Sequence, residues 1–278
     1  MKKLFSVLFF VVAAFGAIAL GAVASSYPEL SALIPSNDTV NGIITASVFP
    51  LAVEAAGLRK FYKEINAAVA NIPNGGFLAA PGDLRSEVQV TNTLSTYSFN
   101  IRDIQMNKTA FPASVGVQDN DLFVSYGLGL FWDSRTATYT NIQLQSYPNP
   151  TAAVAGGITT AQLYTFYNGL LNIQVGSTEF IKQLSTNTFM TIPAAQQSST
   201  SDNSEFDLAA ALKVIGPFPI FSGKADNKVV LNINTNGISD VAGDAQTVLT
   251  FWAKGVVINN GANDPRVYEA VLSALGRL

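Results

Sequence analysis

The chain lacks both cysteine and histidine, and charged residues make up only 13% of its 278 residues. Soluble proteins contain about 25% charged residues on average. Without cysteine or histidine, disulfides, thiolate nucleophiles, histidine-based catalytic triads and Cys/His zinc sites are all excluded. The formal net charge is −3. This charge argues against a sequence-specific nucleic-acid partner, because such surfaces need clustered Lys and Arg.

Charge is scarcest in the middle of the chain, where no charged residue occurs between Arg135 and Glu179. Net charge and charged strand edges normally keep copies of a soluble protein apart. One interpretation is a β-rich protein from a host that tolerates low charge. The interpretation we favour is a surface that mostly faces other subunits.

The N-terminus contains a long apolar run, residues 4–24, which follows Lys2 and Lys3. As a helix this run is long enough to cross a hydrocarbon core of about 30 Å. It predicts either an uncleaved membrane anchor, or a secretory signal peptide cleaved after Ala22-Val23-Ala24. We favour the retained segment. The side chains expected to contact the membrane are Leu4, Phe5, Leu8, Phe9, Phe10, Val11, Val12 and Phe15.

The rest of the chain begins with a Pro-containing connector, expected at residues 25–83. Within it, apolar residues recur at spacings of three and four over residues 51–70, which predicts an amphipathic helix. Pro81-Gly82-Asp83 predicts a turn. A C-terminal helix is expected within residues 263–278, with Asp264 as its N-cap and Pro265 at its first position.

Residues 84–262 contain repeated strand signals separated by turn residues. Polar and apolar residues alternate over residues 96–101 and 171–175, as half-buried strands require. Thr159 or Thr160 is a candidate N-cap for one intervening helix. Because each half-apolar strand must bury one face, the pattern predicts an all-β sandwich. Long connections favour jelly-roll or Greek-key topology over an up-and-down barrel, with a single roll favoured and a double roll possible.

Four segments resemble jelly-roll capsid proteins of tailless icosahedral bacteriophages that contain an internal membrane. The segments are DLFVSYGLGLFW (121–132), the turn Ser146-Tyr147-Pro148-Asn149-Pro150, YNGLLNIQVG (167–176) and LTFWAKGVVINNG (249–261). The resemblance implies jelly-roll subunits, often two rolls per chain, that form trimeric capsomers around a lipid vesicle.

The resemblance and the composition together lead to one functional expectation. We expect a virion structural protein without enzymatic activity or cofactor, which assembles with copies of itself into trimers or higher assemblies. Its other partners would be virion proteins and an internal membrane, which its N-terminus would contact. The alternative is an exported bacterial β-sandwich, secreted or at the cell surface, that acts as an adhesin or carbohydrate-binding protein.

Few residues suggest site chemistry. Weak calcium candidates occur in two short clusters, neither of which has the spacing of the twelve-residue calcium loop. They are Asp119, Asp121, Asp202, Glu205 and Asp207. Trp132 and Trp252 are expected in the core or at a subunit contact rather than on an exposed sugar-binding platform.

Overall fold

The computed structural model describes the chain in several stretches, which form parts of two compact units, residues 1–60 and 61–278. The first unit contributes only the beginning of one helix to the described part. The apolar run and its eight expected membrane-contact residues therefore lie outside the described residues. The structure describes residues 49–73, 75–90, 94–101, 114–136, 144–149, 158–192, 211–233 and 245–277.

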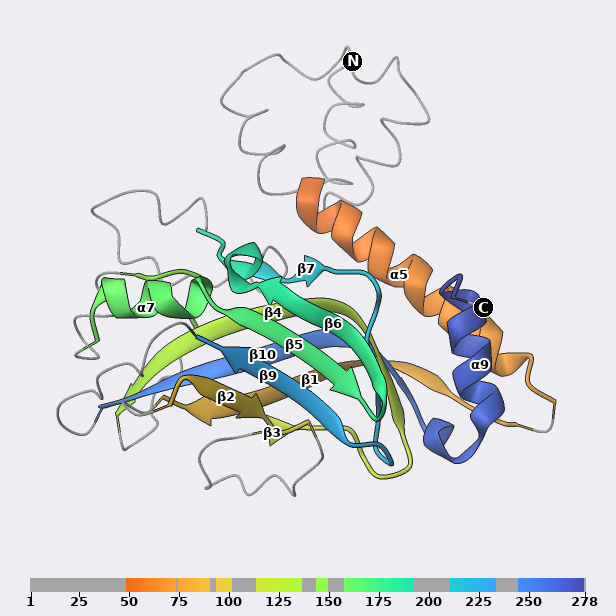
Figure 1. Cartoon of the computed structure of the whole chain (residues 1–278). Coiled ribbons are helices and arrows are strands. Elements are labelled where there is room, and N and C mark those ends of the chain that lie inside the picture. The colour runs from red at the N-terminus through yellow and green to blue at the C-terminus, as the bar shows by residue number, and fades with distance from the viewer. Residues whose placement is uncertain are drawn as a thin grey trace, which may run out of the picture. The chain divides into compact units, whose positions relative to one another are not determined.

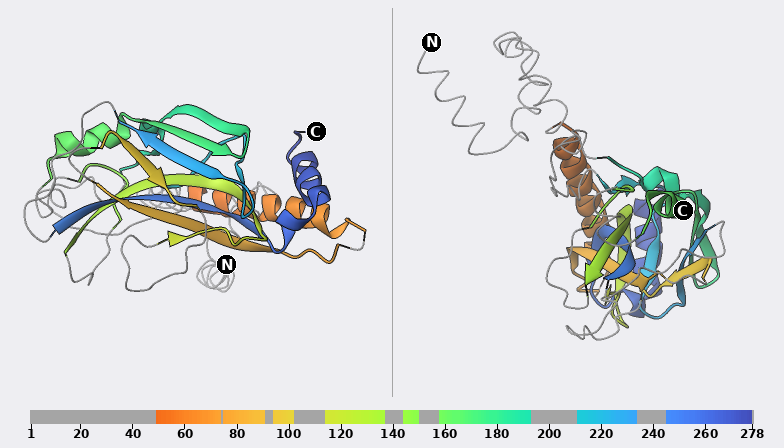
Figure 2. Two further views of the ribbon diagram at one scale, coloured as in Figure 1. Left: turned by 60° about the horizontal axis from the view of Figure 1, so that its bottom comes forward. Right: turned by 90° about the vertical axis from the view of Figure 1, so that its left-hand side faces the viewer.

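The second unit contains two antiparallel sheets, which form two layers in both figures (Figures 1 and 2). The larger sheet has the order β3-β1-β10-β4, and two short strands, β7 and β8, both pair with β4. The smaller sheet has the order β2-β9-β5-β6. The larger sheet consists of β1 (Ala79–Gln89), β3 (Ser114–Val115), β4 (Leu122–Thr136), β7 (Lys213–Val214), β8 (Ile220–Ser222) and β10 (Ala245–Ile258). The smaller sheet consists of β2 (Thr96–Phe99), β5 (Leu170–Val175), β6 (Thr178–Ser185) and β9 (Asn227–Asn232).

The strands follow a regular pairing scheme along the chain. Eight strands remain when the two-residue strands β3 and β7 are not counted. The first of these eight pairs with the last, the second with the second last, and so on, always antiparallel: β1 with β10, β2 with β9, β4 with β8 and β5 with β6. Most of the pairings are therefore between segments that are far apart in the sequence.

The two sheets share one hydrophobic core. Leu249, Phe251 and Ala253 alternate along β10 and are buried in it, as are Val229 and Leu231 of β9. The ring of Phe251 lies 5.8 Å from that of Phe99 in the opposite sheet. Burying a Leu, Val or Phe side chain in this core contributes about 1.5–3 kcal/mol. The expected all-β class is confirmed, and two antiparallel sheets around one core are compatible with the expected sandwich.

Helix α5 (Phe49–Ala70) covers the helix predicted at residues 51–70. Its C-terminal half contributes Phe61 and Val69 to the core of the second unit. The ring of Phe61 lies 5.1 Å from the rings of both Tyr126 and Phe218. These aromatic contacts hold residues 61–70 of the helix against the strand β4.

The two later helices begin where the sequence predicts. Helix α7 (Thr160–Tyr167) starts after Thr159, whose side chain forms a capping box with Gln162. Helix α9 (Pro265–Ala274) follows the N-cap Asp264, which accepts a hydrogen bond from the Arg266 backbone N–H. Val267 and Val271 of α9 are buried in the core of the same chain, so this helix packs on its own subunit.

The turn predicted at Pro81-Gly82-Asp83 is wrong, because these residues lie inside β1 and pair continuously with β10. Strand β3 bonds only to Arg85 and Ser86 of β1. Among the described strands, β1 is therefore an edge strand at Pro81, where proline is tolerated because no second described ladder needs its missing N–H.

Candidate functional site

One end of the sandwich is built from four adjoining turns, which we call the loop end: residues 118–121, 176–177, 223–226 and 259–264. Backbone hydrogen bonds link them. The Gly223 N–H donates to the Asp121 carbonyl at 3.0 Å, and the Ala262 N–H donates to the Asn120 carbonyl at 2.9 Å. A Cβ atom at Gly223 would lie 1.8 Å from a backbone oxygen of the 118–121 turn. Only glycine fits this contact, so the turn at residues 223–226 packs directly against the turn at residues 118–121.

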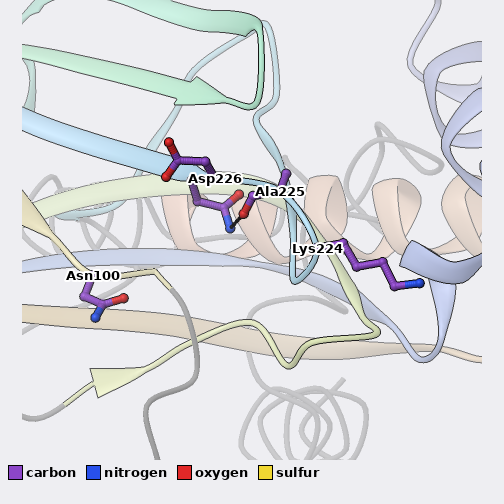
Figure 3. Close-up of a pocket in the computed structure, with 5 residues that line it drawn as sticks. Asn100, Lys224, Ala225 and Asp226 are labelled. Atoms are coloured by element: carbon purple, nitrogen blue, oxygen red, sulfur yellow. Dashed lines mark hydrogen bonds between the residues drawn. The ribbon is translucent and has the colours of Figure 1, made fainter.

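The first of two surface depressions at this end has a volume of about 360 Å³ (Figure 3). In the figure, Lys224 points away from Asp226 and Asn100, so no charged groups converge on a common point. Asp226 is ion-paired with Lys228 at 3.0 Å. The Asn227 amide bonds the backbone of Ser222 on both sides, donating at 2.7 Å and accepting at 3.2 Å. These side chains therefore stabilise the turn between β8 and β9.

The second depression, of about 680 Å³, is larger and contains two of the calcium candidates. The lining residues are Gln118, Asp119, Asn120, Asp121, Asn259 and Asn260. Asp121 Oδ1 accepts a hydrogen bond from the Asn260 N–H at 2.8 Å, which ties the two turns together.

The described residues contain no group of three or more acidic side chains placed to hold a metal ion. Ca²⁺ needs six to eight oxygen ligands. Asp119 and Asp121 therefore do not by themselves form a complete calcium site. The other three candidates, Asp202, Glu205 and Asp207, lie outside the described residues.

The two tryptophans occupy different environments, and neither has the open face of a sugar-binding platform. Trp132 is fully buried, and its Nε1 donates to the Tyr147 carbonyl at 2.7 Å. Its expected place in the core is confirmed. Trp252 is half-buried on the outer face of the larger sheet, where the Arg85 guanidinium lies 5.3 Å from its ring. Its Nε1 donates a long hydrogen bond to Asp83.

Beside Trp252, the outer face of the larger sheet contains a buried charge that sequence reasoning missed. Arg85 forms an ion pair with Glu87, whose side chain is completely buried. Glu87 pairs with Thr250 across the strands, and the Thr250 hydroxyl is buried without a hydrogen-bond partner. In the sequence, only the alternation of Asp83, Arg85 and Glu87 indicates that charged side chains lie together on this face of β1. A buried ion pair contributes little net stability, but removing one partner is strongly destabilising.

Among the described residues, the pKa is shifted for two tyrosines and for the pair Asp264 and Arg266, and local structure explains each shift. Burial raises the pKa of the Tyr167 phenol, which is fully enclosed in the core, and that of Tyr147. Hydrogen bonds from Arg266 lower the pKa of the exposed Asp264 carboxyl. Tyr167 belongs to the core, Tyr147 is half-buried beside Trp132, and Asp264 belongs to a helix cap.

The described residues that bear on a membrane contact are those of the helices and the exposed basic and apolar side chains. Among the described residues, no helix combines the length and the apolar character needed to cross a membrane. The basic side chains of α5, Arg59, Lys60 and Lys63, are exposed. Exposed apolar side chains also occur on the second unit, and sequence periodicity did not mark them as a surface.

No protein-family model matches the chain, and a search of curated proteins finds no significant match.

Proposed function

We propose that this chain is a virion coat protein that builds an icosahedral shell from many copies of itself and has no enzymatic activity. The observation that carries the proposal is the outside-in pairing of the eight strands, β1 with β10 through to β5 with β6. A long antiparallel hairpin that is wrapped once around a common core produces this order, which is the defining arrangement of a jelly roll.

The number of strands favours a single roll over a double one. Two eight-stranded rolls would need about sixteen strands, and the described residues form sheets of six and four. Jelly rolls occur in viral capsids, lectins and cupins. Since the chain contains no histidine, it lacks the imidazole side chain, which is the commonest metal ligand in proteins. The low charge favours a coat subunit, because packed subunits bury neutral surface more cheaply than charged surface.

In this proposal the apolar run at residues 4–24 contacts a membrane inside the shell, and the jelly roll forms the shell with copies of itself as trimers or higher assemblies. Its support is the length and charge pattern of the run. Flotation of the full chain with neutral phosphatidylcholine vesicles tests the contact. Phe9→Asp with Phe10→Asp should abolish co-flotation, and Leu78→Asp, at an exposed position of the other unit, should leave it unchanged.

Electron microscopy of the purified full chain at high concentration tests the assembly. Closed shells, or capsomers of uniform size, are the expected result. A chain that stays a dispersed monomer over the whole accessible concentration range contradicts the proposal. The intact mass in the assembled state should correspond to a chain that begins at Met1.

The second candidate function is an exported carbohydrate-binding or adhesive β-sandwich. The depression at the loop end favours it, because amide and carboxylate groups line that depression and can hydrogen-bond sugar hydroxyls. A mature mass that begins at Ser25, together with binding on a glycan array that Asp119→Ala abolishes, would support this candidate over the coat protein.

A further inference from the structure

We draw no further inference here: the strongest candidate, the surface patch that Asp83, Arg85 and the half-buried Trp252 form on the outer face of the larger sheet, carries nothing because no contact among the described residues shows what would cover it.

Discussion

The hydroxyl of Thr186 should be the main polar attachment of α7 to the sandwich. Thr186 is completely buried. Its hydroxyl accepts a hydrogen bond from the Gly169 N–H at 2.9 Å and donates to the Phe166 carbonyl. Thr186→Val keeps the shape of the side chain and removes both bonds, which leaves two backbone groups buried at the end of α7.

The expected cost follows from these partners. Each buried backbone group that loses its hydrogen bond costs about 1–3 kcal/mol. The Gly169 N–H keeps a longer bond of 3.3 Å to the Phe166 carbonyl, and the Gly169 carbonyl still accepts from the Thr186 N–H at 3.0 Å. Part of the loss is therefore recovered, and we expect Thr186→Val to destabilise the fold by about 2 kcal/mol.

Urea unfolding of the full chain in mild detergent measures this change. A loss of about 2 kcal/mol lowers the urea midpoint by about 1 M for a typical denaturant dependence. Thr188→Val, on the exposed side of the same 3₁₀ turn, is the control and should leave the midpoint within error. Hydrogen exchange at Gly169 should become faster only in Thr186→Val. A midpoint that matches the control would refute the reasoning, because the loss of both hydrogen bonds of the Thr186 hydroxyl would then cost nothing.

Three further predictions concern other parts of the fold. Gly223→Ala should lower the unfolding midpoint markedly, because the added Cβ would lie 1.8 Å from the Gln118 carbonyl oxygen; thermal unfolding measures this. The carboxyl of Asp264 should titrate below 3.8 in NMR spectra, and Arg266→Gln should raise its pKa. The stabilisation from this pair is complete above pH 3.8 and is lost as pH falls through the lowered pKa. Tyr167→Phe should not change the ultraviolet titration of the folded chain near pH 10, because burial raises the pKa of the Tyr167 phenol. The contribution of the neutral Tyr167 phenol to stability is complete below pH 10. It is lost at higher pH, where this phenol ionises in the unfolded chain.

The strands that could be predicted from the sequence are those whose two faces have different environments. In β5, Leu171, Ile173 and Val175 are buried and alternate with half-buried residues, so the period of two is visible in the sequence. The helix caps Thr159 and Asp264 were also predictable, because their side chains bond backbone groups only two or three residues away. Such local interactions are encoded by a few neighbouring residues.

Strand β6 was missed because its backbone is irregular. Its pairing with β5 shifts register, and Gln183 has a positive φ of 53°. The Gln183 N–H donates to the Asn172 side chain at 2.8 Å. As a result Phe180 and Ile181 are both buried in succession, which removes the alternation that identifies a strand. Partner order could not be predicted either, since β1 and β10 are separated by most of the chain and share no sequence signal.

The positions of the charges suggest why so few are present. In the second unit, several are used to hold the backbone: Asp121 joins two turns, Asp264 caps α9 and the buried Glu87 is paired with Arg85. Charge in such places stabilises local geometry through short hydrogen bonds. A self-assembling subunit gains from this distribution, because neutral outer surface can be buried between copies without the desolvation penalty of a charge.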